Sequence, residues 1–349
     1  MICHAARRNH RAYAFGVFSL VMTASGFCFF FLFCVPRVGV LQRSSSWKFS
    51  FNLRLTEPPW LWGSQEANQN EILEGVLNRA AMRNRTVILT TLNKAWAAPG
   101  SIIDLFLESF RIGEQTSDLL NHLVIICLDQ SSVERCESIH SHCFLLSTEG
   151  TDFSAEKLFG TPDYLKMMWR RIKFLRTVLE LGFDFVFTDA DIMWFRNPFH
   201  QFFPDADFQI ACDKFNGNSS DVNNFVNGGF KYVKSNHRTI RFYEFWYNSG
   251  KFYPALHDQD VLDIIKKNSF TNEIGLKMKF LDTAYFGGFC EPSKDMNKVC
   301  TMHANCCIGL QNKLSDLRLT LDDWRNFTVQ TTLERSRPPT WRAPKSCHM

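Results

Sequence analysis

The sequence has no strong excess of charge of either sign. Its 349 residues include 39 Lys and Arg and 35 Asp and Glu, which gives a formal net charge of +4. The basic residues are not clustered among aromatic residues, as a groove for nucleic acid requires. We therefore expect no nucleic-acid partner. The sequence also lacks an internal repeat and a Cys-x-x-Cys pair, and without such a pair a thiolate metal site is not expected.

A long uncharged stretch lies near the start of the chain. Residues 12–35 contain no charged side chain and are followed by Pro36-Arg37. Because about 20 apolar helical residues cross the hydrocarbon core of a bilayer, this stretch predicts a transmembrane helix. It ends in the aromatic run 29–34 rather than in a small-x-small cleavage site, so we expect an uncleaved signal-anchor. A cleaved signal peptide and a buried core helix are the alternatives.

Features of the rest of the chain predict how this anchor is oriented. The basic residues on its two sides nearly balance, so charge alone does not decide the orientation. Three Asn-x-Ser/Thr sequons begin at Asn84, Asn218 and Asn326, and a sequon has meaning only in a lumenal body. The expected order is a cytosolic tail (1–11), the signal-anchor (12–35), a polar stem (36–80), a catalytic domain (81–335) and a C-terminal tail (336–349).

Nine cysteines lie in the body, from Cys127 to Cys347. This number is typical of an oxidising compartment, with nine buried thiols as the alternative. Because the number is odd, at least one thiol is expected to stay unpaired. Adjacent cysteines do not easily chelate one ion in tetrahedral geometry, so a disulfide role is expected for Cys306-Cys307. At least one bridge is expected, and its candidate members are Cys290, Cys300, Cys306 and Cys307.

From residue 86 onwards, short apolar runs alternate with helical stretches. The predicted strands are residues 86–92, 122–128, 143–146 and 183–188. Residues 164–181 carry apolar side chains at three- and four-residue spacing and stop at Gly182, which predicts a helix. Strands that are apolar on both faces and alternate with helices predict an α/β fold with a mostly parallel sheet. Ligands of such sheets bind beyond the carboxyl ends of the strands.

Two carboxylates directly follow the last of these strands, in Asp189-Ala190-Asp191. Two carboxylates one residue apart at a strand end are able to approach one hard cation, such as Mn²⁺ or Mg²⁺. A pair of ordinary turn aspartates is one alternative. Another is a phosphohydrolase of the haloacid dehalogenase type, with Asp189 as nucleophile. Those enzymes generally have Thr or Val where this chain has Met193, and their motif lies early in the domain.

Three further segments accompany the strand and acidic turn at 179–199. They are Asn227-Gly228-Gly229-Phe230, the Asp-Gln-Asp segment at 257–262, and the segment from Thr301 to Lys313. Together and in this order, the four segments resemble the motifs of the plant nucleotide-diphospho-sugar transferases of glycosyltransferase family 77. The resemblance covers roughly residues 84–325 and is to a poorly characterised branch of that family.

This resemblance implies a GT-A fold, in which a Rossmann-like, mostly parallel mixed sheet is flanked by helices. It implies a Golgi enzyme that transfers a sugar from a UDP-sugar to a glycan or glycoprotein acceptor, with retention of configuration, and the predicted signal-anchor gives this enzyme a single-pass type II topology. It also implies Mn²⁺ or Mg²⁺ bound by Asp189, Asp191 and His303. A catalytically silent sugar-binding or scaffold protein on the same fold is the alternative.

Roles for further residues follow from the same resemblance. The residues implied to act at the sugar are Asp258, Asp260 and Asn227. The residues implied to bind the donor are Asp189, Thr90, Trp96, Arg171, Gly228, Gly309 and Lys313. Ordinary structural roles are the alternatives for three of these residues: a helix N-cap for Asp258, and solvated helix positions for Arg171 and Lys313.

Overall fold

The computed structural model describes residues 59–146, 153–155, 160–331 and 340–347. The predicted cytosolic tail and signal-anchor, and the predicted stem as far as residue 58, lie outside these residues. Within the described part of the chain, no helix combines the length and the apolar character that crossing a membrane requires.

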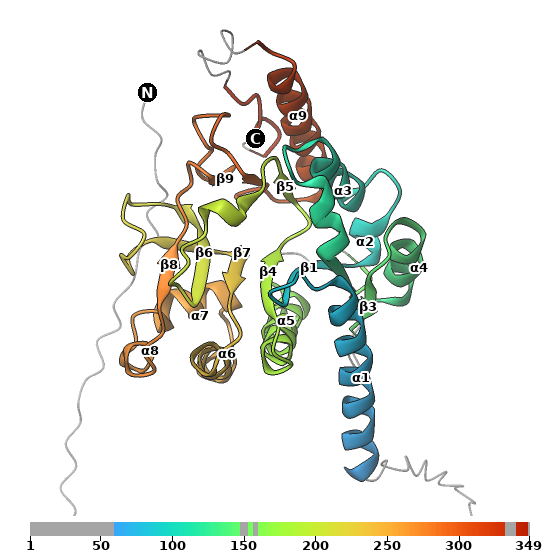
Figure 1. The fold of residues 1–349 in the computed structure, drawn as a ribbon, viewed down its shortest axis with the longest axis vertical. Coiled ribbons are helices and arrows are strands. Elements are labelled where there is room, and N and C mark those ends of the chain that lie inside the picture. Colours follow the sequence, from blue (N-terminus) through green and yellow to red (C-terminus); the bar gives the residue numbers. More distant parts are fainter. Residues whose placement is uncertain (1–58, 147–152, 156–159, 332–339, 348–349) are drawn as a thin grey trace, which may run out of the picture. The chain divides into compact units, whose positions relative to one another are not determined.

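The fold is built on a seven-stranded sheet with the strand order β3-β2-β1-β4-β7-β6-β8 (Figure 1). Strand β7 runs antiparallel to both of its neighbours, and the other neighbouring pairs are parallel. The predicted α/β fold with a mostly parallel sheet is therefore confirmed. The strands are β1 (Thr86–Leu92), β2 (Leu123–Cys127), β3 (Cys143–Leu145), β4 (Asp184–Thr188), β6 (Phe208–Lys214), β7 (Phe225–Val233) and β8 (Met278–Phe280).

A second sheet of three short strands has the order β5-β10-β9. Its strands are β5 (Ile192–Trp194), β9 (Phe286–Gly288) and β10 (Thr301–His303). Strand β10 pairs antiparallel with β5, so that His303 lies opposite Ile192. This pairing returns the C-terminal part of the chain to the acidic turn that follows β4.

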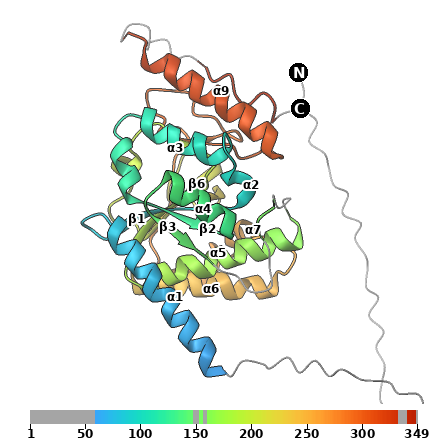
Figure 2. The same ribbon diagram turned by 90° about the vertical axis from the view of Figure 1, so that its right-hand side faces the viewer.

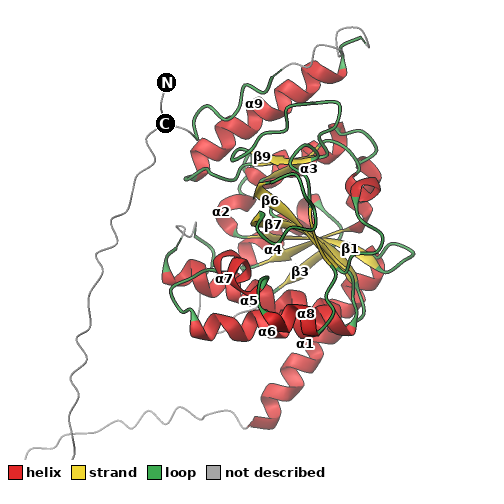
Figure 3. Cartoon of the chain, turned by 90° about the vertical axis from the view of Figure 1, so that its left-hand side faces the viewer, coloured by secondary structure: helices red, strands yellow, loops and turns green. Residues whose placement is uncertain are grey.

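Helices cover the main sheet on both faces. Figures 2 and 3 show α1, α5 and α6 along one face, with α3 and α9 on the other. Alternate residues of β1 serve the two layers: Val87 and Leu89 belong to one hydrophobic cluster, and Ile88 belongs to the other. The helices are α1 (Pro59–Ala80), α2 (Lys94–Ala97), α3 (Ile102–Ile112), α4 (Gln130–Ile139), α5 (Pro162–Glu180), α6 (His237–Ser249), α7 (Asp258–Ile265), α8 (Ser269–Glu273) and α9 (Leu310–Thr328), with the 3-10 turns η1 (Ser117–His122), η2 (Pro198–Gln201) and η3 (Gly250–Phe252).

Helix α1 corrects the predicted extent of the stem. We expected residues 36–80 to be polar and irregular, but residues 59–80 form one helix. Its last two turns bury Leu73, Val76, Leu77 and Ala80 against the sheet. Their three- and four-residue spacing is that of an apolar helical stripe. The stripe is short and follows a Gln- and Asn-rich turn, so the composition of the segment concealed it.

The described end of the chain, residues 340–347, also departs from the predicted C-terminal tail. The indole of Trp341 stacks on Phe195, with ring centroids 5.6 Å apart. The carboxylate of Asp316, which is fully buried in α9, accepts hydrogen bonds from the backbone N–H groups of Lys345, Ser346 and Cys347. A buried carboxylate requires hydrogen-bond donors, and residues 345–347 supply them to Asp316. This end of the chain is therefore part of the folded body.

The described part of the chain contains three disulfides, Cys136–Cys143, Cys290–Cys306 and Cys307–Cys347. The expected disulfide role of Cys306-Cys307 is confirmed, and each of the two cysteines has a different partner. Among the expected members, Cys300 is a buried free thiol, as are Cys127 and Cys212.

We expect Leu77→Ala to lower the free energy of unfolding by about 2–5 kcal/mol, because a fully buried leucine would leave a cavity. The matched control is Ile72→Ala on the same helix, where the side chain is 55% exposed and the change should stay within about 0.5 kcal/mol. Urea unfolding of the two variants measures both effects. Equal stabilities would contradict the packing of α1 on the body.

Candidate functional site

The acidic turn joins the two sheets. It begins where β4 leaves the main sheet and ends where β5 enters the small one. The backbone N–H of Asp189 donates to the carbonyl of Gly229 on β7 at 2.7 Å, and the N–H of Ile192 donates to the carbonyl of Asp189 at 3.2 Å. These two bonds fix the turn at the carboxyl end of β4, where the sequence pattern predicted a ligand site.

The three predicted metal ligands lie together at this turn. His303, at the end of β10, has its Nε2 atom 3.2 Å from Oδ1 of Asp191. Asp189, Asp191 and His303 each offer a ligand atom, and these atoms all lie within 4.8 Å of one another. Asp191 and His303, which are more than 100 positions apart in the sequence, are thus brought together by the pairing of β10 with β5.

Asp191 is buried, and its charge is balanced by neighbouring groups. Nζ of Lys313 lies 2.5 Å from Oδ2 and also donates to the carbonyl of Ala304 at 3.0 Å. Burial would raise the pKa of Asp191, but the Lys313 ammonium and the His303 imidazole hold that pKa well below its ordinary value. Lys313 is therefore not the solvated helix lysine that the sequence left as an alternative.

A divalent cation fits these residues. Oδ1 of Asp191 is buried without a well-aligned hydrogen-bond partner, which is costly for a carboxylate oxygen unless a cation or donor compensates it. Two carboxylates and one imidazole form a ligand set that suits Mn²⁺ and accepts Mg²⁺ less readily. Burial, together with the nearby Asp191 carboxylate, raises the pKa of Asp189 despite the opposing effect of Arg171. A cation between the two carboxylates would reverse that shift.

Arg171 connects Asp189 to Asp258. Its guanidinium, on α5, donates to Oδ1 of Asp189 at 2.9 Å and to Oδ2 of Asp258 at 2.7 Å. Only 6% of Arg171 is exposed, so the alternative of a solvated helix arginine is wrong. Burial opposes ionisation of Asp258, but the Arg171 guanidinium keeps its pKa well below the ordinary value. Asp258 is therefore an ionised partner of Arg171.

The start of α7 separates the two carboxylates predicted to act at the sugar. His257 is the N-cap, and its Nδ1 accepts the backbone N–H of Gln259 at 3.2 Å. The alternative of an N-cap role for Asp258 is therefore wrong. Asp260 lies at the surface with its side chain 49% exposed, 3.3 Å from Nε2 of His257. A role for Asp260 at the sugar stays a prediction.

Glycines on β7 permit a close approach between β7 and the candidate metal ligands. A Cβ atom added to Gly229 would lie 2.6 Å from Cε1 of His303 and 2.7 Å from Oδ2 of Asp189. At Gly228 the nearest atom would be 3.7 Å away, on Gln259. The side chain of Asn227 accepts the backbone N–H of Gly229 at 2.9 Å. The Asn-Gly-Gly sequence thus lets the backbone of β7 support the acidic turn without an intervening side chain.

The remaining predicted donor-site residues lie in different surroundings. Thr90 is fully buried in β1, so it has no exposed surface through which to touch a nucleotide. Trp96, on α2, is half-buried, and its ring centroid lies 5.7 Å from Nζ of Lys313. Gly309 precedes α9 with φ +90°, a conformation that favours glycine. It sets the direction of the helix that carries Lys313.

Two polar residues beside the site were not predicted. Lys231 on β7 is fully buried; its Nζ donates to the carbonyl of Gly228 at 2.8 Å and lies 4.4 Å from the ring centroid of Phe187. Burial lowers the pKa of Lys231 to about 7. Asp213 lies at the end of β6 and accepts bonds from three side-chain amides. Two sequence signals could have identified them: Lys231 is a lysine inside an apolar strand, and Asp213 is an acid at a strand end.

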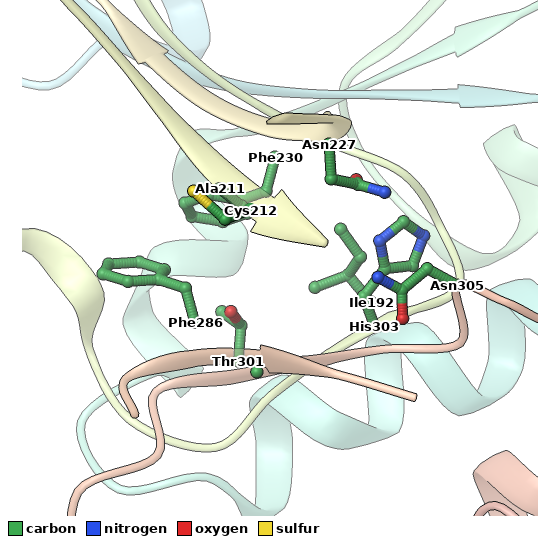
Figure 4. Close-up of a pocket in the computed structure, with 10 residues that line it drawn as sticks. Ile192, Ala211, Cys212, Asn227, Phe230, Phe286, Thr301, His303 and Asn305 are labelled. Atoms are coloured by element: carbon green, nitrogen blue, oxygen red, sulfur yellow. The ribbon is translucent and has the colours of Figure 1, made fainter. Parts of the chain in front are cut away.

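A small hollow adjoins the candidate metal ligands (Figure 4). Its polar edge is made by His303, Asn227 and Asn305. The other lining residues are Ile192, Ala211, Cys212, Phe230, Phe286, Gly287 and Thr301. The hollow lies between the main sheet and the small sheet, so it borders the carboxyl ends of the strands.

Comparisons with known proteins found a matching family model, related sequences and solved structures. The sequence profile described as nucleotide-diphospho-sugar transferase matches residues 118–317. The Arabidopsis thaliana protein At4g15970 is 51% identical over 293 residues, which cover 83% of this chain and 78% of that protein. The UDP-galactose:fucoside alpha-3-galactosyltransferase of Dictyostelium discoideum is 31% identical over 103 residues, which cover 27% of this chain and 15% of that protein. A crystal structure of a glycosyltransferase involved in glycosylation of the major capsid of PBCV-1 has 12% identity and a TM-score of 0.40, covering 67% of this chain and 98% of that chain.

We expect Gly229→Ala to disrupt the acidic turn, because the added methyl group would overlap both His303 and Asp189. The stability cost should be about 1–3 kcal/mol, with loss of Mn²⁺ binding measured by titration calorimetry. Gly228→Ala is the matched control, since its methyl group meets only ordinary van der Waals distances. A Gly229→Ala variant as stable as Gly228→Ala, with Mn²⁺ affinity unchanged, would contradict this close approach.

Proposed function

This chain belongs to the nucleotide-diphospho-sugar transferase family and is a glycosyltransferase. From that premise we propose that it transfers a sugar from a UDP-sugar to a glycan or glycoprotein acceptor. In this proposal, a divalent cation is bound by Asp189, Asp191 and His303. The observation that carries the proposal is the convergence of these three ligand atoms within 4.8 Å. The Oδ1 atom of Asp191, which is buried without a well-aligned hydrogen-bond partner, adds support. Mn²⁺ is the cation that this mixed oxygen and nitrogen ligand set favours.

The charges around the acidic turn suit a diphosphate leaving group. When bound, the cation would supply electrostatic stabilisation of the charge that develops on the departing diphosphate. Lys313 lies against Asp191 at the same point, so its ammonium is positioned to contact the phosphates as well. Arg171 pairs with Asp189 at 2.9 Å. The role of Arg171 in this proposal is to orient a ligand carboxylate.

A UDP-sugar is the donor that the comparisons favour. The Dictyostelium discoideum relative is named for UDP-galactose as its own donor. We propose only the nucleotide, and not the galactose, for this chain, because the matched part covers 27% of this chain's length. Membership of glycosyltransferase family 77 is part of the same proposal and rests on the four sequence motifs.

We further propose that the transfer retains the anomeric configuration and proceeds on the front face of the sugar. A double displacement needs a carboxylate free to attack the sugar. Asp258 is instead ionised and paired with the buried Arg171, and Asp260 is directed to the surface beside His257. In a front-face reaction, the leaving phosphate and the acceptor hydroxyl share one side, so no such nucleophile is required.

The cation requirement is tested on the body of the protein by UDP release from a panel of UDP-sugars. We expect EDTA to abolish UDP binding and activity, and Mn²⁺ to restore both. Asp191→Ala should lower kcat/KM by about 10²-fold or more, since ligand loss weakens leaving-group stabilisation, while the surface variant Asp205→Ala should match the wild type. Tight UDP binding in EDTA that Asp191→Ala leaves unchanged would favour the silent scaffold instead.

The location that we propose is the Golgi membrane, with a single-pass type II topology and a lumenal catalytic body. It rests on the uncharged stretch 12–35 and on the sequons. In vesicles from plant cells the protein should resist carbonate extraction, and its body should be protected from protease until detergent is added. Digestion of the body in intact vesicles would overturn the orientation.

A further inference from the structure

Asp213 is the meeting point of three side-chain amides. It is the next-to-last residue of β6 and is half-buried. Its Oδ1 atom accepts bonds from Nδ2 of Asn227 at 2.8 Å and from Nδ2 of Asn305 at 2.7 Å. Its Oδ2 atom accepts a bond from Nε2 of Gln259 at 3.0 Å. One carboxylate therefore contacts β7, the loop after β10 and the start of α7.

Each of these amides uses its oxygen on a backbone N–H group. Asn227 accepts from Gly229 at 2.9 Å, and Gln259 accepts from Gly228 at 2.8 Å. Asn305 likewise accepts from the backbone of Cys290, at 3.1 Å. A side-chain amide has one accepting end and one donating end. A carboxylate that accepts all three donating ends consequently turns all three oxygens toward the backbone.

The backbone groups held in this way lie next to the candidate metal ligands. The carbonyl of Gly229 accepts the N–H of Asp189 at 2.7 Å, and Gly229 lies against both His303 and Asp189. Asn305 follows His303 by two residues. The two ligands come from distant parts of the chain, and Asp213 is bonded to residues adjoining both of them.

We propose that Asp213 is a positioning residue that fixes the Gly228–Gly229 backbone and the loop after His303, and thereby sets the geometry between Asp189 and His303. The inference rests on the proposed function of that cation site. The loop after His303 is also held by the Cys290–Cys306 disulfide and by pairing of β10 with β9. The larger effect of losing Asp213 should therefore fall on Gly228 and Gly229.

An isosteric substitution isolates the role of the carboxylate. In Asp213→Asn, the amide oxygen would stay with the two donors that share Oδ1, and the new NH₂ group would face the NH₂ group of Gln259. Turning the Gln259 amide over would not help, because its NH₂ group would then face the N–H of Gly228. The hydrogen-bond pattern has no satisfied solution in this variant, although its volume is unchanged.

A second substitution restores the pattern. In the double variant Asp213→Asn with Gln259→Glu, the new amide donates to the new carboxylate, whose other oxygen accepts the N–H of Gly228. The bonds from Asn227 and Asn305 are kept. Gln259→Glu alone places two carboxylates against each other and should be defective. The two single variants are therefore expected to be damaged and the double variant to recover, which loss of packing alone does not predict.

The experiment compares the wild type, the two single variants and the double variant. Hydrogen exchange at the Gly228 amide, measured without metal, should be at least about tenfold faster in both single variants, whereas the Gly229 amide keeps its bond to Asn227. Mn²⁺ affinity in the presence of UDP should fall by about 10- to 100-fold in them, as for other residues that orient metal ligands. The double variant should recover the slow exchange and most of the affinity.

The outcomes separate this inference from the proposed function. Recovery of slow exchange in the double variant supports the positioning role, even if the wild type binds no Mn²⁺, a result that would refute the cation site alone. Single variants that exchange like the wild type overturn the positioning role. So does a double variant that is no better than Asp213→Asn, including one that fails to fold.

Discussion

The ion pairs of the buried Arg171 guanidinium are the interaction on which the rest of the site depends. They hold Asp189 after β4 and Asp258 at the start of α7, two carboxylates from separate parts of the chain. Removing one partner from such a buried set typically costs about 3–5 kcal/mol, because the remaining charge loses its compensation. With Asp189 held in this way, the turn presents Asp191 to β10 and α9, so that His303 and Lys313 meet it from the other side. The order of elements around the site follows from satisfying these charges.

The charge balance of this cluster also suits the diphosphate binding that we propose. The carboxylates of Asp189, Asp191 and Asp258 face the cations of Arg171 and Lys313, while Lys231, with a pKa of about 7, is only partly charged near neutral pH. The cluster is thus close to neutral by itself. Addition of a divalent cation makes it positive, which favours a diphosphate that carries the opposite charge. In the proposed function, this arrangement would couple binding of the cation to binding of the nucleotide.

Most of the sheet could be predicted from the sequence, because buried parallel strands are continuous apolar runs. Residues 86–92 form β1 as expected, and the predicted helix 164–181 is α5 with its ends shifted by one or two residues. The acidic turn could be predicted because ligands of parallel α/β sheets bind beyond the carboxyl ends of the strands. Asp213 and the pairing of the cysteines were not readable, since both depend on contacts between distant segments. The roles of Asp258 and Arg171 were left open for the same reason: whether a charged residue is solvated or buried is decided by tertiary packing.

Cys306 and Cys307 have consequences beyond cross-linking. Cys306 and Cys307 are consecutive and form disulfides with different partners, Cys290 and Cys347. The peptide between them is therefore restrained by two distant segments of the chain. This restrained peptide begins three residues after His303. Residues 340–347 are therefore mechanically connected to the candidate metal ligands, although they lie far from His303 in sequence. A chain cut before Cys347 would lose one of the two disulfides that restrain the loop after His303.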